Sequence, residues 1–287
     1  MLGEFQSRHG EEFGARMINA ADARRICPGL VEDGLRAALW SPHELSVDPR
    51  QAIRAIPMYL REGLGVTTVF GALANRVEEG RVELSDGRVI ECEVAVVCSG
   101  EDFQTLFPRE FEDSGLTRCK LQMMRTPAQP GGWRLGPHVA AGLTLLHYKA
   151  FEASSTLAAL RERMERERPE YLRWGIHVLA SQNEAGEVAI GDTHEYGMAV
   201  EPFCREDLDQ LVLRYLGTFL HLPEPRVAER WMGVYAKSTM GATEYVRSPK
   251  PGVWIVNGVG GMGMTLSFGL AQEVWDGVDR GSWEPGA

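Results

Sequence analysis

The chain has 287 residues, 44% of them hydrophobic and 24% charged, which is enough for one large domain or two ordinary ones with buried cores. Its formal net charge of -10, with no block of clustered lysine and arginine, argues against nucleic-acid binding. Five cysteines without a CxxC pair predict neither a disulfide framework nor a zinc motif, and they favour a reducing compartment. With no signal-peptide core and no 18-residue apolar stretch, we expect a cytoplasmic protein without a membrane partner.

The first half of the chain predicts helices followed by short strands. Residues 19–30 favour a short helix, and residues 46–65 favour a longer one, with Asp48 as its cap and Pro57 as a kink. Residues 94–98 are apolar on both faces, which predicts a buried, parallel strand. Further short strands are expected at residues 66–70, 71–77, 82–84 and 89–92. A hairpin turn at SDGR joins the last two of them.

The second half predicts a larger antiparallel sheet with two helices. Residues 155–174 form a charged helical pattern, and residues 205–220 place five apolar side chains on one helix face, which indicates core packing. The strands of the sheet are expected at residues 119–126, 140–148, 174–182, 187–196 and 230–240.

A strand, a glycine loop and a helix are predicted near the end of the chain, from residue 253 to residue 274. Gly258, Gly260 and Gly263 have the spacing of the GxGxxG dinucleotide fingerprint. A complete fingerprint opens a βαβ unit of about 30 residues, with an acidic residue about 20 positions further on. Here only DRGSWEPGA follows the helix, so we do not expect this loop to begin a complete nucleotide-binding unit.

Five motifs carry a resemblance to a known family: DPRQAIRAIPMYLREG, AVVCSG, GDTHEYG, RWMGVYAK and VNGVGGMGMTLSFGLAQEV. In this order and spacing they resemble the flavin-dependent D-amino-acid oxidase and glycine/sarcosine oxidase group, over about residues 17–278. Within it the chain is most similar to a bacterial branch associated with phosphonate breakdown. The resemblance implies FAD as cofactor. It also implies oxidation of a C–N bond in a small amine, an amino acid or an aminophosphonate, by hydride transfer to flavin N5.

The resemblance also implies a mixed α/β fold of two interwoven domains. An incomplete Rossmann-like FAD-binding domain is expected at residues 46–115 and 249–287. A substrate domain on a large, mainly antiparallel sheet is expected at residues 1–45 and 116–248. The family begins with a strand–GxGxxG–helix unit that holds the FAD pyrophosphate, and the sequence starts after it.

Three explanations remain open for the missing unit. The chain is truncated, or a second chain of a heteromeric amine oxidase supplies the unit, or the protein is a flavin-free remnant that binds small anions. At the truncated edge we expect the strands at residues 94–98 and 253–256 to lose the central neighbour that would cover them.

By resemblance, the terminal glycine loop lies beside the flavin ring. Glycines without a Cβ let the backbone approach a flat ring, and the N-terminus of the following helix would stabilise the anionic reduced flavin. A tight strand-to-helix turn without a ligand is the structural alternative. The predicted cofactor-binding residues are Ser99, Gly100, Gly260, Gly261, Met262, Gly263, Met264 and Thr265.

The substrate site is predicted from cations on strand faces. Related amine oxidases often hold a carboxylate with the arginine of a GxRP strand; here Tyr235 replaces it, and Lys237 points to the same face. Lys120 and Gln122 are expected to share one strand face, and His147 and Lys149 another, so that several strands direct cations toward a phosphonate. For each lysine, a solvated surface charge is the alternative. The predicted substrate-binding residues are Lys120, Gln122, His147, Lys149, Tyr235, Lys237 and His43.

No catalytic acid or base and no metal ligand is predicted. The sequence HELSV resembles the HExxH zinc motif, but Val47 stands where the second histidine is needed. His177 and His194 alternate with apolar neighbours and are expected to be core histidines, with His177 a weak substrate candidate.

Overall fold

The structure, a computed structural model, describes residues 1–280 and divides into two compact units. Unit 1 holds most of the predicted substrate domain, and unit 2 holds most of the predicted FAD-binding domain; the ligands assigned to them stay predictions. Two of the boundaries fall within the strands β7 (Leu116–Ala128) and β12 (Glu229–Ser238), and two more fall within helix α3 (Pro49–Leu64) and strand β11 (Glu195–Gly197). Unit 1 comprises Met1–Tyr59, Leu121–Glu195 and Pro202–Gly233, and unit 2 comprises Leu60–Lys120, Tyr196–Glu201 and residue 234 onward.

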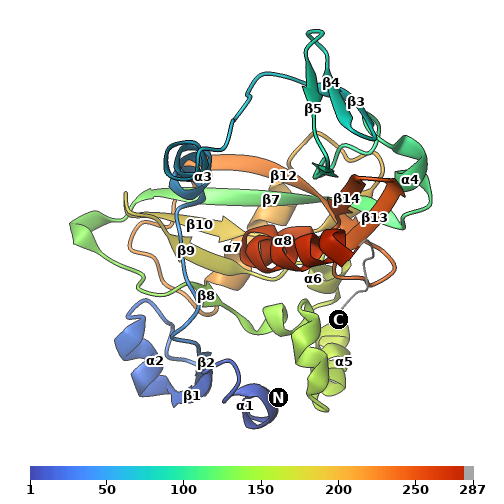
Figure 1. Ribbon diagram of the computed structural model, residues 1–287. Coiled ribbons are helices and arrows are strands. Elements are labelled where there is room, and N and C mark those ends of the chain that lie inside the picture. Colours follow the sequence, from blue (N-terminus) through green and yellow to red (C-terminus); the bar gives the residue numbers. More distant parts are fainter. Residues whose placement is uncertain (281–287) are drawn as a thin grey trace. The chain divides into compact units, whose positions relative to one another are not determined.

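The largest sheet is antiparallel wherever its register is defined, which confirms the predicted fold class. Its strand order is β11-β7-β10-β9-β8, and β12 also pairs with β7 (Figure 1). The strand β10 lies antiparallel between β7 and β9, and β9 lies antiparallel to β8. Besides β7 and β12, the strands are β8 (Val139–Ala140), β9 (Leu179–Gln182), β10 (Glu187–Gly191) and β11 (Glu195–Gly197).

The core of unit 1 lies between this sheet and helix α7 (Glu206–Leu216), which runs behind the strands in Figure 1. Of the five apolar side chains predicted to share a helix face, three are buried, and Tyr215 and Phe219 are partly buried against the same cluster. From the helix, Leu208 and Val212 are at most 1% exposed, and from the strands Met124 and Ile190 are fully buried in the same cluster.

The remaining elements of unit 1 confirm the two predicted N-terminal helices. Asn19 caps α2, since its side chain accepts the backbone N–H of Asp22, and Asp48 accepts the N–H of Arg50 at the start of α3. Strands β1 and β2 pair antiparallel. These elements are α1 (Leu2–His9), β1 (Arg16–Asn19), α2 (Ala20–Ile26), β2 (Ala37–Trp40), α3 (Pro49–Leu64), η1 (Pro130–Gly132), η2 (Gly142–Leu146), η3 (Lys149–Ala153), α5 (Leu157–Glu167) and α6 (Pro169–Arg173).

The strand predicted at residues 140–148 is wrong. After Ala140 the chain forms the 3-10 turns η2 and η3, because Thr144 accepts the N–H groups of both His147 and Tyr148. The backbone N–H of Leu143 donates to the Tyr215 hydroxyl at 3.0 Å, which fixes the turn against α7. A short apolar run does not distinguish a strand from a helical turn.

The parallel strand predicted in unit 2 is confirmed. Strand β14 (Val253–Asn257) pairs with β6 (Ala95–Val97) in parallel and with β13 (Tyr245–Lys250) antiparallel. Helix α8 (Gly263–Arg280) covers one face of β14, where Trp254 packs with Val274, while Val253 and Ile255 face a second apolar cluster. The expectation that residues 253–256 lack a covering neighbour is therefore wrong.

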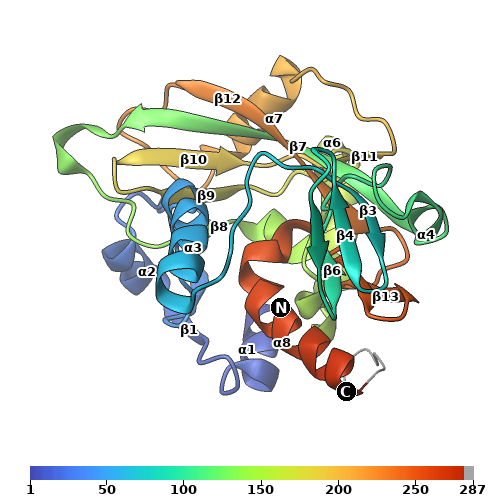
Figure 2. The same cartoon turned by 45° about the horizontal axis from the view of Figure 1, so that its top comes forward.

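Strand β6 has one open edge, because within residues 1–280 it pairs with β14 alone. Ala95 and Val97 are buried, but Val96 is 42% exposed, so burial on both faces was predicted wrongly for this strand. A cavity of about 450 Å³ lies along β6 and the β3–β4 pair, which appear side by side in Figure 2.

A separate antiparallel meander and one short helix complete unit 2. The meander has the order β3-β4-β5, and the predicted SDGR turn joins β4 to β5. No strand forms at residues 66–70, where Val66 and Phe70 are exposed. The elements are β3 (Ala74–Glu78), β4 (Arg81–Leu84), β5 (Val89–Glu91) and α4 (Pro108–Glu112). Among the helices within residues 1–280, none has the length and apolar character needed to span a bilayer.

Candidate functional site

The glycine loop of unit 2 follows β14 and leads directly into α8. Gly258 and Gly260 have positive φ angles of 76° and 62°, a conformation that side chains with a Cβ rarely adopt. A Cβ on Gly258 would also lie 2.8 Å from Leu116 Cδ2. After the 3-10 turn η4 (Gly260–Met262), helix α8 begins at Gly263, one residue before the predicted start. These glycines are therefore required by the turn itself.

The loop presents bare backbone at the surface of its unit. Gly261 and Thr265 are exposed, Met264 is 47% exposed, and Phe268, one turn further along α8, is 73% exposed. The N–H groups in the first turn of a helix have no intrahelical acceptor and carry partial positive charge. Exposed backbone N–H groups at a helix N-terminus are suited to the acceptor edge of a planar ring, so the loop stays the predicted contact for the isoalloxazine end of FAD.

Two predicted substrate residues on β12 lie against this loop. A Cβ on Gly261 would lie 3.4 Å from the Tyr235 hydroxyl, and a Cβ on Gly260 would lie 3.6 Å from Lys237 Cδ. Lys237 also forms an antiparallel bridge with Val259. Both side chains are half-buried. The structure thus brings together the predicted ring-binding loop, a hydroxyl and an ammonium, all within unit 2.

Asn257, which was not predicted, connects the two predicted cofactor segments. Its Nδ2 donates to the backbone oxygen of Gly100 at 2.9 Å and lies 3.4 Å from Ser99 Oγ, while its Oδ1 accepts the N–H of Gly258 at 2.7 Å. The turn at Ser99 and Gly100 is therefore held beside the start of the glycine loop. A polar residue at the end of an otherwise apolar strand is the sequence signal that identifies it.

The two predicted residues on β7 are buried. Lys120 is fully buried, and Gln122 is 1% exposed. The Gln122 amide accepts the N–H of Arg205 at 2.7 Å and donates to its carbonyl at 3.0 Å and to Asp209 Oδ1 at 2.8 Å. These bonds hold the start of α7, so we do not include Gln122 in the proposed site.

The other predicted substrate residues lie in unit 1 and do not share a strand face. Because residues 140–148 form turns, His147 ends η2 and is half-buried, whereas Lys149 begins η3 and is exposed. His43 is exposed in a loop and packs on Gly14, where a Cβ would lie 2.4 Å from its ring. The expected pairing of His147 with Lys149 on one face is therefore wrong.

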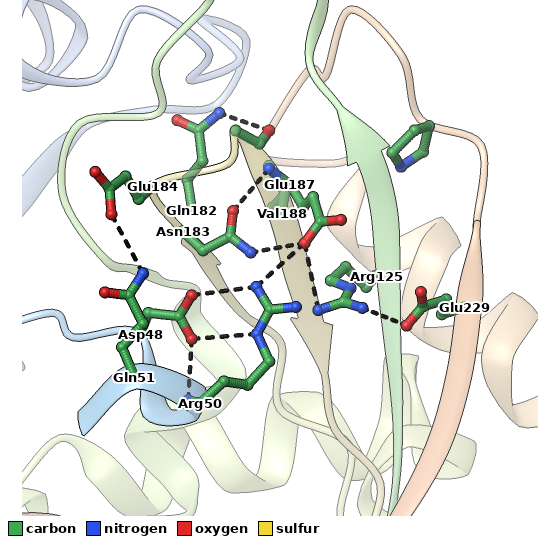
Figure 3. Close-up of polar contacts among 12 residues, drawn as sticks. Asp48, Arg50, Gln51, Arg125, Gln182, Asn183, Glu184, Glu187, Val188 and Glu229 are labelled. Atoms are coloured by element: carbon green, nitrogen blue, oxygen red, sulfur yellow. Dashed lines mark hydrogen bonds and ion pairs between the residues drawn. The ribbon is translucent and has the colours of Figure 1, made fainter. Parts of the chain in front are cut away.

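Unit 1 has an ion-pair network around a cavity of about 360 Å³ (Figure 3). Arg50 and Arg125 both lie 3.3 Å from Glu187 Oε2, and Arg125 also pairs with Glu229. Arg50 binds Asp48 through two nitrogens. Each guanidinium thus contacts carboxylates on at least two residues, which indicates a structural clamp between the start of α3 and the sheet.

We expect this clamp to weaken at low pH. The hydrogen bond from Arg50 lowers the pKa of Asp48 below its usual 3.8. The stabilising effect of the ionised Asp48 carboxylate is therefore complete above about pH 4, and it is lost as the pH falls through the lowered pKa of Asp48. In urea unfolding between neutral pH and about pH 3, the difference in midpoint between wild type and Asp48→Asn should shrink on acidification. A constant difference would contradict this assignment.

A cavity of about 420 Å³ in unit 1 is mainly apolar, and none of the predicted site residues lines it. Burial lowers the pKa of His138, one of its few polar side chains. A binding site normally needs several polar groups that converge on the ligand, and this cavity has few, so we do not propose it as the functional site.

Comparison with known proteins identifies one family and a shared fold. A family model described as FAD dependent oxidoreductase matches residues 1–276. No curated protein sequence matches the chain. The structure is similar to glycine oxidase from Geobacillus kaustophilus, with a TM-score of 0.68, 16% identity, and coverage of 97% of this chain and 66% of that chain.

Two further solved structures show the same fold. L-proline dehydrogenase from P. horikoshii has a TM-score of 0.68 at 16% identity, covering 99% of this chain and 78% of that chain. Iminodiacetate oxidase from a Chelativorans species has a TM-score of 0.65 at 21% identity, covering 98% of this chain and 68% of that chain. The chain thus spans about two thirds of the length of the glycine oxidase and iminodiacetate oxidase structures.

Proposed function

Because the chain belongs to the FAD dependent oxidoreductase family, we propose that it oxidises the C–N bond of a small amine or amino acid. FAD, the predicted cofactor, is the cofactor of this family. The observation that carries the proposal is the bare glycine loop at the start of α8, flanked by Tyr235 and Lys237. When bound, FAD supplies the acceptor for a hydride from the carbon that bears the amine.

The protein's part in this reaction is positioning and electrostatics. Gly260 and Gly261 leave room for the ring to contact the backbone, and the N-terminus of α8 would stabilise negative charge at the ring edge near Met264 and Thr265. The turn at Ser99 and Gly100, held by Asn257, would line the other side of the loop. These residues bind and orient, and none needs to transfer a proton if the amine arrives neutral.

Lys237 and Tyr235 would determine which amines are accepted. An ammonium and a hydroxyl next to the ring site suit the acid group of an amino acid, and a dianionic phosphonate would gain more from the charge than a carboxylate. The neighbouring structures include enzymes named for glycine, proline and iminodiacetate, all of which carry an acid group. We therefore propose an acidic amine as substrate, with aminophosphonates among the candidates.

The remaining part of the FAD site would come from a strand–GxGxxG–helix segment outside the 287 residues. The open edge of β6 and the cavity beside it suit an added parallel strand. The segment would belong to a longer form of this polypeptide or to a second chain of a heteromeric oxidase. A flavin-free protein that binds small anions is the alternative from another functional class.

Titration of the purified 287-residue chain with riboflavin and with FAD tests the ring site. We expect both to bind with similar, weak affinity, because the loop is proposed to contact the ring and the pyrophosphate site is proposed to lie in the segment outside the 287 residues. Anaerobic loss of flavin absorbance on adding sarcosine, glycine or aminomethylphosphonate then tests the reaction. Saturable binding of aminomethylphosphonate without any flavin binding would support the flavin-free alternative instead.

A further inference from the structure

Three histidines far apart in the sequence come together in unit 1. His147 ends η2, His177 precedes β9, and His194 follows β10. One ring nitrogen from each lies within 4.8 Å of the others. The His177 and His194 side chains are only 3% and 2% exposed. Three imidazoles gathered at a buried position are a donor set suited to zinc and similar divalent metals.

Two backbone hydrogen bonds join the segment that carries His177 to the segment that carries Asp192 and His194. The N–H of Asp192 donates to the carbonyl of His177 at 3.1 Å, and the N–H of His194 donates to the carbonyl of Trp174 at 2.8 Å. The chain after β10 is therefore held against the chain before β9, which places His194 and Asp192 opposite His177.

The orientation of His194 is that of a metal ligand. Its Nδ1 lies 2.8 Å from the carbonyl oxygen of Gly175, so Nδ1 donates its N–H there and Nε2 is the nitrogen left to bind a metal. A histidine that binds a metal through one nitrogen commonly donates the other N–H to such a carbonyl. Gly175 has a φ of 54°, and a Cβ there would lie 2.8 Å from His194 Cβ, so a glycine at this position keeps the ring in place.

A carboxylate lies beside the same two nitrogens. Asp192 Oδ1 is 3.3 Å from His177 Nε2, and Oδ2 is 3.9 Å from His194 Nε2. Two ligand atoms of a tetrahedral zinc are separated by about 3.3 Å, given zinc–nitrogen distances of about 2.0–2.1 Å. The first pair already has this separation, the second must shorten by about 0.6 Å, and ring nitrogens as much as 4.8 Å apart must approach by up to about 1.5 Å.

We propose that His147, His177, His194 and Asp192 form a binding site for one divalent metal of the zinc class. Nε2 of His177 and of His194, a ring nitrogen of His147 and the Asp192 carboxylate would be the ligands. The positive ion would also favour placing a carboxylate among nearly buried rings. Sequence motifs cannot reveal the site, because the three histidines are 30 and 17 positions apart and belong to different elements.

Metal analysis of the untagged, full 287-residue protein tests the proposal. The protein is treated with a chelator, dialysed, and titrated with ZnCl2 or with CoCl2, whose visible spectrum reports tetrahedral coordination. We expect one metal ion per chain and a higher unfolding temperature with metal than without. The affinity for the metal should not depend on added flavin.

Variants separate this site from adventitious binding. His194→Gln should weaken Zn²⁺ binding at least about 100-fold, and Asp192→Asn about 10- to 100-fold. His147→Gln removes a half-buried ligand and provides the same test should His194→Gln fail to fold. His221→Gln, at an exposed histidine outside the cluster, should bind Zn²⁺ like wild type.

Two outcomes would overturn the proposal: no saturable binding of a single ion by the folded wild-type chain, or equal affinity in wild type and His147→Gln. Either would identify the cluster as stacked core imidazoles, whose ring centroids now lie 3.9 Å apart for His147 and His177.

Discussion

Replacing Gly261 with leucine is expected to weaken flavin binding by about 100-fold, about 2.8 kcal/mol, while leaving the fold intact. The residue is exposed, its φ is not in the left-handed region, and its Cβ would lie 3.4 Å from the Tyr235 hydroxyl, so the backbone tolerates a side chain. A leucine there would occupy the surface on which the ring is proposed to lie. Flavin fluorescence titration measures the loss, and a thermal melt confirms folding.

Gly269→Leu is the matched control for this substitution. Gly269 lies further along α8 and is exposed, and a Cβ added there would meet no atom within 4 Å. Leucine is a better helix former than glycine, so this variant should be as stable as wild type or slightly more so. It should bind flavin normally. Unchanged flavin affinity in folded Gly261→Leu would show that the ring does not lie on the glycine loop.

The sequence predicted the parts of this site that depend on local geometry. The glycine spacing defines a strand-to-helix turn whichever ligand it serves, because Gly258 and Gly260 need positive φ. Tyr235 and Lys237 share a face because alternate residues of a strand do. Both predictions rest on a few consecutive residues, so they needed no knowledge of how distant segments pack.

Predictions that required distant packing succeeded less well. His147 and Lys149 were expected to share a strand face. Instead, the Thr144 carbonyl accepts the N–H groups of His147 and Tyr148, and Tyr215 anchors Leu143, so this segment forms turns. Gln122 was predicted to bind substrate, yet Arg205 and Asp209, more than 80 positions away, use its amide. Strand β13 was missed because Pro249 lies within it, and proline is unfavourable in a paired strand. No local pattern contains this information.

The predicted preference for an acidic substrate depends on Lys237. Lys237→Met should lower kcat/KM for acidic amines about 10- to 100-fold, mainly through KM, because a charge-assisted hydrogen bond to a ligand is worth about 1.5–3 kcal/mol. The flavin-loaded enzyme is assayed anaerobically, with an added dye as the electron acceptor that reoxidises the flavin, on sarcosine, on aminomethylphosphonate, and on benzylamine, which lacks an acid group. Turnover of benzylamine should change little, since it makes no contact with the ammonium.

Two further variants separate the charge of Lys237 from its packing against Gly260 and Val259. Lys237→Arg keeps the positive charge and should retain most of the preference for acids. Lys250→Met removes a lysine of the same unit that pairs with Glu78 at the surface, and it should leave the preference unchanged. If Lys237→Met reduced turnover of all three amines equally, the residue would act by holding the glycine loop through its bridge to Val259. Selection of the acid group would then have to come from other residues.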